Sequence, residues 1–301
     1  MSDRGRLEGR RAVVTGGTRG IGQATASELL SLGAEVLVVA RRAEGVERAL
    51  AGWRAEHGGR ARGVAADVTA ADGRAAIVQE VQAAWGGLDI LVNNAGTNIR
   101  KRLEAYEEPE IGMLLAANLE SSLELCRLLY PLLRREGVGG RDGGAGDGDG
   151  RDGGAGGDGA GRGGDDSGAD RQGHAPAPPS TASIVNVASI AALTALGTGA
   201  VYSAAKAGLV HLSRYLAVEW GGQGIRVNCV APWYIRTPLV APVLDDPERL
   251  ARVLSKTPLG RVGEPEEVAS VIAFLCSDGA SYLSGVVIPV DGGMLSDQRV
   301  I

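Results

Sequence analysis

The sequence has little of what several functional classes require. It contains three cysteines, three histidines, a single phenylalanine and only 4% aromatic residues. Cys126, Cys229 and Cys276 lie far apart and form no CxxC pair, and the histidines share no short spacing. Neither a disulfide framework nor a metal site is therefore expected, and the thiols are expected to be buried in a reducing compartment.

Long hydrophobic runs are also missing. The densest apolar stretches, such as Val36–Ala40, are as long as strands and far shorter than the ~20 residues that a membrane span needs. The first eleven residues are polar and of mixed charge, unlike a secretory signal or a transit peptide. These absences predict a cytoplasmic protein without a membrane partner.

One segment differs from the rest of the chain in composition. Residues 137–180 hold 18 of the 47 glycines, eight aspartates and four arginines, and Val138 is their only large aliphatic residue. This composition buries too little apolar surface to offset the entropy of ordering, which predicts a disordered loop insert. A segment that folds on a partner is the alternative. The insert carries −4 of the formal charge of −5, so the remainder is nearly neutral, which argues against a nucleic-acid partner.

Short runs rich in valine and isoleucine alternate with helix-like segments. This alternation predicts an α/β fold in which a parallel sheet is covered by helices on both faces. We expect one doubly wound, Rossmann-type domain over residues 1–301, interrupted by the insert. The seven expected strands are Ala12–Thr15, Glu35–Ala40, Arg62–Ala66, Leu88–Asn93, Ser183–Ala188, Arg226–Val230 and Val286–Val290.

A glycine-rich motif, TGGTRGIG, occupies residues 15–22 directly after the first expected strand. Glycines at this place let the backbone approach a diphosphate, and the next helix presents free N–H groups to it. The motif is not GxGxxG and no GK[ST] is present, which disfavours a nucleoside triphosphatase P-loop. Alone, the motif also fits a plain strand-to-helix turn.

The second expected strand is followed by Arg41 and Arg42, where a carboxylate would select a free ribose 2′-hydroxyl. Arg19 lies within the glycine-rich motif. Guanidinium groups bind a phosphate through paired hydrogen bonds. With the glycine motif, these arginines favour NADP(H) over NAD(H), the alternative being that they are solvated surface charges.

Asn93-Asn94-Ala95-Gly96 follows the fourth expected strand. Its side-chain amides are placed to tie neighbouring strands together and to border the cofactor. A simple Asn-Gly turn explains the same residues when they are considered alone.

The most specific pattern combines Ser189, Tyr202 and Lys206. Tyr202 and Lys206 lie at i and i+4, on one face of an expected helix. An ammonium group beside a phenol lowers its pKa from ~10, so Tyr202 can exchange a proton with an oxygen that Ser189 holds. A YxxxK pair also occurs by chance, and the order of all four motifs gives it weight.

Taken together, TGGTRGIG (15–22), NNAG (93–96), Asn118, Ser189 and YSAAK (202–206) resemble the short-chain dehydrogenase/reductase family. The resemblance covers the chain outside the insert. Three further stretches are similar to the tropinone reductase-like branch of that family: NNAGTNIRK (93–101), APWYIRTPLV (231–240) and TPLGRVGEPEEV (257–268).

The resemblance implies roles for individual residues. Tyr202 is implied as the catalytic acid/base, Ser189 as the group that orients the substrate, Lys206 as a ligand of the nicotinamide ribose, and Asn118 as the holder of a water in a proton relay. The implied cofactor-binding residues are Gly16, Thr18, Arg19, Gly20, Ile21, Gly22, Arg41, Arg42, Asp67, Val68, Asn94, Ala95, Gly96, Tyr202, Lys206, Pro232, Ile235 and Thr237.

We therefore expect an NADPH-dependent carbonyl reductase that acts on a small-molecule ketone or aldehyde and forms a homotetramer or homodimer. Trp233–Val262 is expected to be the substrate loop, with an apolar wall at residues 239–244 closed by Asp245 and Asp246. Two alternatives remain. Arg100-Lys101-Arg102 hints at a 3-oxoacyl carrier-protein reductase, and a non-catalytic NADPH-binding scaffold could use the acidic insert to dock a partner.

Overall fold

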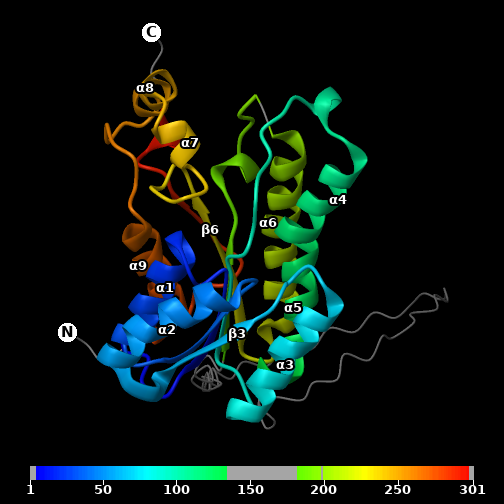
Figure 1. Cartoon of the computed structure of the whole chain (residues 1–301), viewed down its shortest axis with the longest axis vertical. Coiled ribbons are helices and arrows are strands. Elements are labelled where there is room, and N and C mark those ends of the chain that lie inside the picture. Colours follow the sequence, from blue (N-terminus) through cyan, green and yellow to red (C-terminus); the bar gives the residue numbers. More distant parts are fainter. Residues whose placement is uncertain (1–4, 134–181, 198, 298–301) are drawn as a thin grey trace, which may run out of the picture.

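Seven parallel strands form a sheet through the centre of the molecule (Figure 1). The computed structural model describes residues 5–133, 182–197 and 199–297, and the insert expected at 137–180 lies outside them. All seven predicted strands are confirmed, and each bound is within two residues of its expected place. The strands are β1 (Arg11–Thr15), β2 (Glu35–Ala40), β3 (Ala61–Ala65), β4 (Ile90–Asn93), β5 (Ala182–Val187), β6 (Ile225–Pro232) and β7 (Val287–Val290).

The strand order is β3-β2-β1-β4-β5-β6-β7. From β1 the chain winds outward through β2 to β3, and then it crosses back to place β4 on the other side of β1. The connections therefore leave the carboxyl ends of β1 and β4 in opposite directions. In open parallel sheets a crevice for ligands forms at this switch point.

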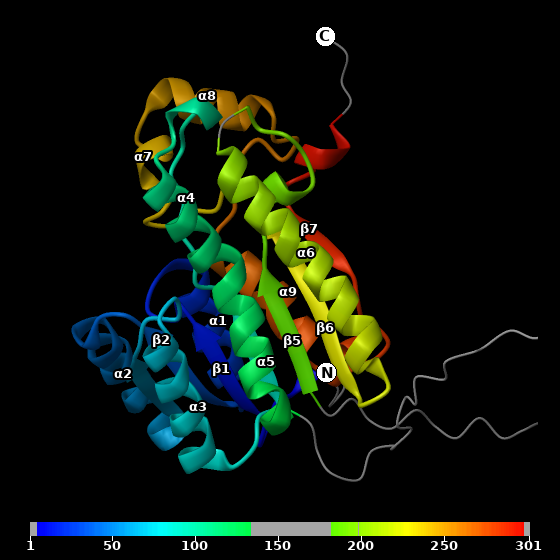
Figure 2. The same cartoon turned by 90° about the vertical axis from the view of Figure 1, so that its right-hand side faces the viewer.

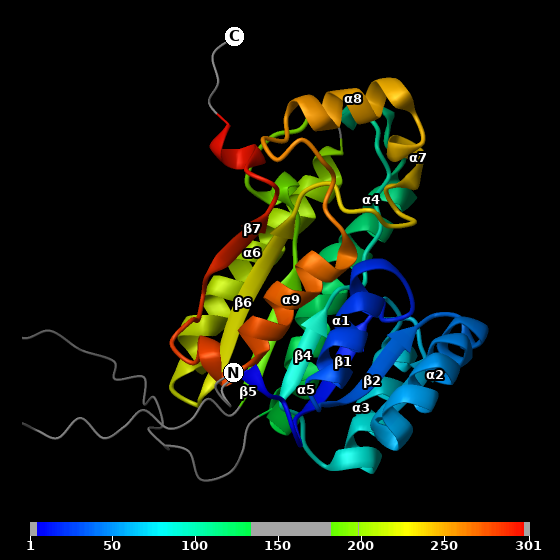
Figure 3. The ribbon, with the colours of Figure 1, turned by 90° about the vertical axis from the view of Figure 1, so that its left-hand side faces the viewer.

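Helices cover both faces of the sheet, as predicted for a doubly wound fold. On one face lie α1 (Gly20–Ser31), α2 (Ala43–His57) and α9 (Pro265–Cys276), as Figure 3 shows. The other face carries α3 (Ala71–Trp85), α5 (Ser121–Leu133) and α6 (Ala200–Gly221), as Figure 2 shows. Within the described part of the chain, no helix has the length and apolarity that crossing a membrane requires.

Each face of the sheet has its own apolar core. Successive strand residues point to opposite faces, so Val36 and Val38 pack in the core beneath α1, α2 and α9. Leu37 and Val39, from the same strand, pack in the core beneath α3, α5 and α6. All four side chains are almost fully buried. This explains why the strands show continuous apolar runs and no strict alternation with polar residues.

Several short elements lie around the carboxyl ends of the strands. Helix α4 (Glu108–Leu115) continues through the π-helical turn η4 (Ala116–Glu120) into α5. Two helices, α7 (Ala241–Leu244) and α8 (Pro247–Ser255), project beyond this edge (Figures 1 and 2). Of the short 3₁₀ turns, η3 (Leu103–Ala105), η5 (Ile190–Ala192) and η7 (Met294–Ser296) also follow strands, whereas η2 (Gly58–Arg60) and η6 (Asp278–Ala280) precede β3 and β7 at the opposite edge.

Candidate active site

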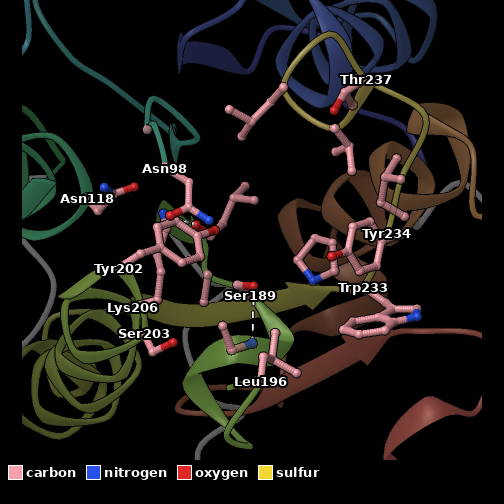
Figure 4. A pocket seen from close by; sticks show the side chains of 18 of the residues that line it. Asn98, Asn118, Ser189, Leu196, Tyr202, Ser203, Lys206, Trp233, Tyr234 and Thr237 are labelled. Atoms are coloured by element: carbon pink, nitrogen blue, oxygen red, sulfur yellow. Dashed lines mark hydrogen bonds between the residues drawn. The ribbon is translucent and has the colours of Figure 1, made fainter. Parts of the chain in front are cut away.

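A cavity of about 410 Å³ lies at the carboxyl ends of β4, β5 and β6 (Figure 4). Ser189 follows β5, Tyr202 and Lys206 come from the first turns of α6, and these three side chains approach one another there. The structure thus brings together residues from six separate parts of the chain. The predicted site residues that line the cavity are Ile21, Asn94, Gly96, Asn118, Ser189, Tyr202, Lys206, Pro232, Ile235 and Thr237.

The glycine-rich loop and the NNAG motif hold the ends of β1 and β4 together. The Thr15 hydroxyl accepts hydrogen bonds from the backbone N–H groups of Asn94 (2.9 Å) and Ala95 (3.0 Å), and Asn94 Nδ2 donates to the Thr15 carbonyl (2.9 Å). Gly16 has φ +64°, and a Cβ there would lie 2.9 Å from Asn94 Nδ2. Glycine is thus required by both conformation and space.

The start of α1 is built to accept an anion. Its N-cap residue, Arg19, makes no side-chain capping bond, and its first turn contains no acidic residue. The N–H groups of this turn therefore lack the usual side-chain acceptor, and they carry the positive end of the helix dipole. Gly20 packs against Thr237, because a Cβ at Gly20 would lie 3.0 Å from Thr237 Cγ2. The loop after β6 thus reaches the start of α1.

The other predicted cofactor residues lie along the same edge, over β1, β2 and β3, outside the cavity. Arg19, Arg41 and Arg42 are exposed, and none forms an ion pair with another described residue. Burial raises the pKa of Asp67, but hydrogen bonds from Thr69 and the charge of Arg41 outweigh this and hold it below its ordinary value. Arg41 and Asp67 are therefore neighbours.

Val68 and Thr18 lie beside α3 and α2, respectively. Val68 packs its side chain into the core under α3, and its carbonyl accepts a hydrogen bond from Arg74 at 2.9 Å. Only its N–H is left to face a ligand. Thr18 lies beside Gly45 at the start of α2, where a Cβ on Gly45 would be 3.7 Å from the Thr18 hydroxyl oxygen. Gly22 packs against the carbonyl of Gly16 with no room for a side chain.

Asn118 explains the π-helical turn η4. Its Nδ2 donates to the carbonyls of Leu114 (2.9 Å) and Thr97 (2.8 Å), and its Oδ1 accepts from the Thr97 N–H at 3.3 Å. The carboxamide thus takes over the Leu114 carbonyl, which is four residues earlier, and α4 and α5 join through a wider turn. Asn118 is fully buried and clamps the loop after β4 to this helix.

Ser189 and Tyr202 lie close together. The Ser189 hydroxyl accepts a hydrogen bond from the Ala191 N–H at 3.2 Å, which leaves its own proton to donate. Burial raises the pKa of Tyr202 above its ordinary value, and the Ser189 hydroxyl and the Arg100 charge act in the opposite direction. The lowering of the Tyr202 pKa expected from Lys206 is absent in this structure, so the phenol is protonated at neutral pH.

Lys206 is almost fully buried, and its ammonium is hydrogen-bonded to the backbone at the end of β5 and not to the Tyr202 hydroxyl. Nζ donates to the Val187 carbonyl at 2.8 Å and lies 5.9 Å from the centroid of the Tyr202 ring. Burial lowers the pKa of Lys206 to about 8. Gly96 makes room for this arrangement, because a Cβ there would lie 2.7 Å from Asn118 Oδ1 and 3.5 Å from Nζ of Lys206.

The predicted substrate loop needs a correction. Leu239 and Val240 line the cavity, but Val243 and Leu244 belong to a separate small core under α7 and α8. Asp246 does not close the apolar wall. It caps α8, because its Oδ1 accepts from the N–H groups of Glu248 (3.0 Å) and Arg249 (3.1 Å). Val243 and Leu244 therefore pack beneath two helices, and Asp246 caps one of them, instead of forming a wall of the cavity.

Arg100, Trp233, Tyr234 and Lys256 also line the cavity. None was predicted as an individual site residue, although the last three fall within the predicted substrate loop. Trp233 and Tyr234 are stacked edge to face with centroids 4.6 Å apart, and Figure 4 shows both on the side opposite Tyr202. The aromatic pair after β6 was the signal available. Among the described residues, no group of three or more His, Cys, Asp or Glu side chains is placed to hold a metal ion.

Comparisons with known proteins identify the family of the chain. Two family models match, one described as short chain dehydrogenase over residues 10–141 and one described as Enoyl-(Acyl carrier protein) reductase over residues 172–295. A tropinone reductase homolog of Arabidopsis thaliana is 40% identical over 95% of this chain and 92% of its own length. One from Datura stramonium is 33% identical over 95% of this chain and 92% of its own length.

Solved structures give the same result. A gluconate 5-dehydrogenase from Burkholderia cenocepacia, in complex with NADP and tartrate, matches with a TM-score of 0.79 and 28% identity over 98% of each chain. The Pseudomonas aeruginosa RhlG/NADP active-site complex matches with a TM-score of 0.76 and 32% identity over 98% of this chain and 99% of its own. The chain therefore belongs to the short-chain dehydrogenase/reductase family, in its tropinone reductase-like branch, and is an oxidoreductase acting on CH–OH or carbonyl groups.

Proposed function

We propose that this protein is an NADPH-dependent carbonyl reductase that converts a ketone or aldehyde to an alcohol. One observation carries the proposal. Ser189, Tyr202 and Lys206 meet in a cavity at the carboxyl edge of the sheet, and arginines that pair with no described residue lie along the same edge over β1 and β2. Along this edge, the arginines would hold the phosphates of a dinucleotide and the residues around Tyr202 would hold its nicotinamide.

The residues at this edge fit NADP(H). Arg19, Arg41 and Arg42 would bind the 2′-phosphate, because their guanidinium groups have no ion-pair partner among the described residues and match a phosphate well. The glycine-rich loop and the uncapped start of α1 would bind the diphosphate. Asp67 and the Val68 N–H would face the adenine. The relatives solved with NADP support this choice.

At the nicotinamide end, Gly96 and the backbone around Pro232, Ile235 and Thr237 would contact the ring and its ribose, since all of them line the cavity. Ile21, Asn94 and Ala95 would lie between the two ends. When bound, the cofactor supplies the hydride.

The protein supplies the proton. The Tyr202 phenol carries its proton at neutral pH, as an ordinary phenol does, and in the reductive direction its hydroxyl would donate that proton to the substrate oxygen. Ser189 donates a hydrogen bond to the same oxygen. Burial raises the pKa of the phenol, so the phenolate that forms needs a positive charge nearby. A cofactor ribose beside Lys206 would compete with the Val187 carbonyl for its ammonium, and this would bring a positive charge to bear on the phenolate that forms.

Asn118 would act as a positioning residue in this mechanism. Both N–H groups of its carboxamide donate to backbone carbonyls, of Thr97 and Leu114, and its Oδ1 accepts from the Thr97 N–H with one lone pair left. By holding the loop that contains Gly96 near Lys206, it would shape the path by which a water returns a proton to the site.

The two alternatives have less support. A carrier-protein reductase needs a basic surface for an acidic partner, but Lys101 is paired with Glu110 and Arg102 with Glu104, each at 2.6 Å. A non-catalytic scaffold gives no reason for three proton-handling side chains to converge in one cavity.

We also propose a homodimer or homotetramer formed through α5 and α6, on which Leu123, Tyr215 and Val218 are exposed. If the protein sediments as a monomer at micromolar concentration in analytical ultracentrifugation, the proposed oligomer is wrong.

The direct test is NADPH oxidation, followed at its absorbance maximum, against a panel of carbonyl compounds. The panel includes tropinone, simple cyclic ketones, quinones and acetoacetyl thioesters. We expect turnover with at least one ketone and a lower rate with NADH. If the protein binds NADPH but reduces none of the panel's carbonyl compounds, the proposed activity is wrong.

A further inference from the structure

The cavity has an unbalanced charge. Arg100, Lys206 and Lys256 line it, and no aspartate or glutamate among the described residues does. The chemistry proposed above uses Lys206 but needs neither of the other two. Arg100 and Lys256 are exposed, so they lie at the mouth of the cavity, where an incoming substrate passes.

Arg100 differs from the two basic residues that follow it. Lys101 and Arg102 are each neutralised by a glutamate, whereas Arg100 makes no ion pair with a described residue. Its guanidinium carbon lies 5.8 Å from the centroid of the Tyr234 ring, in the wall of the cavity. An aromatic face attracts a guanidinium without using its N–H donors. The donors of Arg100 are therefore free for a ligand.

Arg100 is also close to the reacting groups. Its charge acts on the Tyr202 phenol, which identifies it as an electrostatic neighbour of that side chain. A group held by Arg100 would therefore belong to the same small molecule as the carbonyl that Ser189 and Tyr202 bind. Planar carboxylates match the fork of a guanidinium with two parallel hydrogen bonds.

We propose that Arg100 determines substrate specificity by binding the carboxylate of an oxo acid, and that Lys256 adds positive charge at the rim of the cavity. The substrate class is a ketone that carries a carboxylate a few bonds from the carbonyl carbon. The same charges repel ketones that carry a protonated amine. This inference rests on the proposed carbonyl reduction and names its substrate class.

Three ketones of similar size, each with its carbonyl in a six-membered ring, test the inference by turnover. They are 4-oxocyclohexanecarboxylate, its neutral methyl ester, and N-methylpiperidin-4-one, which is protonated at neutral pH. One charge-assisted contact at a partly exposed site is worth about tenfold in kcat/KM. We expect the wild type to prefer the carboxylate over the ester by about that factor, and the amine to be the poorest substrate.

Substitution of Arg100 separates its role from general surface charge. Arg100→Gln is expected to abolish the preference for the carboxylate over the ester, whatever its effect on the absolute rates, while Arg100→Lys retains part of the preference. Arg102→Gln is the matched control. It removes the same charge only two residues further along the chain, from a side chain that is exposed and paired with Glu104. It is expected to behave as wild type.

A binding experiment tests the inference independently of turnover. Isothermal titration calorimetry of the protein–NADPH complex compares cyclohexanecarboxylate with cyclohexanecarboxamide, neither of which can be reduced. We expect wild type and Arg102→Gln to bind the carboxylate about tenfold more tightly than the amide. Arg100→Gln is expected to bind the two compounds equally. Equal affinities in wild type, or a preference that survives in Arg100→Gln, overturn the inference. Carboxylate binding through Arg100 without turnover of any ketone contradicts the proposed reduction and supports the role of Arg100.

Discussion

Replacing Arg41 with aspartate is predicted to weaken NADPH binding and to leave NADH binding almost unchanged. Arg41 is the first residue after β2, is exposed, and pairs with no carboxylate closely enough to form an ion pair within the described chain. Its charge reaches Asp67 after β3. It therefore lies over the strand ends where the 2′-phosphate is proposed to bind.

The size of the effect follows from the lost contact and the introduced charge. A hydrogen bond to a charged group contributes about 1.5–3 kcal/mol, which corresponds to roughly 10–100-fold in affinity. An aspartate about 4 Å from the phosphate adds about 1 kcal/mol of repulsion in water. Because the site is exposed and screened by salt, we expect an overall loss of about 30-fold within that range.

The assay is a fluorescence titration of NADPH and of NADH. The quantity compared is the dissociation constant for NADH divided by that for NADPH, which Arg41→Asp is expected to lower. Arg48→Asp is the matched control, because Arg48 is exposed on α2 and the substitution changes the net charge equally. The reasoning is refuted if Arg41→Asp leaves the ratio at its wild-type value. It is also refuted if Arg48→Asp lowers the ratio as much, since the effect would then be long-range.

Two further predictions concern stability and the insert. Burial lowers the pKa of Lys206 to about 8, whereas an unfolded lysine titrates near ~10.4. Between these two pH values the unfolded state binds more protons, so the free energy of unfolding of wild type relative to Lys206→Met should rise with pH by about 3 kcal/mol. A difference that stays constant in urea unfolding from pH 7 to pH 10.5 would contradict this prediction. Replacing residues 139–178 with a short Gly-Ser linker should keep activity within a few-fold, because α5 ends and β5 begins at the edge of the sheet opposite the cavity and closure entropy changes slowly with loop length. A trimmed protein that folds but loses most of its activity at saturating NADPH would show that the insert reaches the site.

Much of the fold could be predicted because its signals are local. The central strands are short apolar runs buried on both faces, so their positions follow from composition alone, as with Glu35–Ala40. The glycine-rich loop follows β1 and must turn sharply, and Gly16 accordingly has a positive φ. The direction of the crossovers then places the ends of β1, β4 and β5 at one edge, which brings the four motifs together.

The features that could not be predicted depend on contacts between distant residues. The turn at Asn118 exists because its carboxamide bonds to Thr97, twenty-one residues earlier. The small core under α7 and α8 is formed by Val240, Val243 and Val253 with Val262, whose spacing shows no clear helical period. Arg100 appeared to be one of three equivalent basic residues until the structure showed that glutamates neutralise the other two.

The central claim is that this chain reduces carbonyl compounds with NADPH and that Tyr202 supplies the proton. The most direct measurement is deuterium transfer from NADPH labelled at C4 to a ketone that wild type reduces, with the product analysed by mass spectrometry. The account predicts label on the carbinol carbon with wild type. It also predicts transfer that is slower by about 10²–10⁴-fold with Tyr202→Phe, although this variant binds NADPH as wild type does. Equal rates of label transfer by the two proteins would contradict the account.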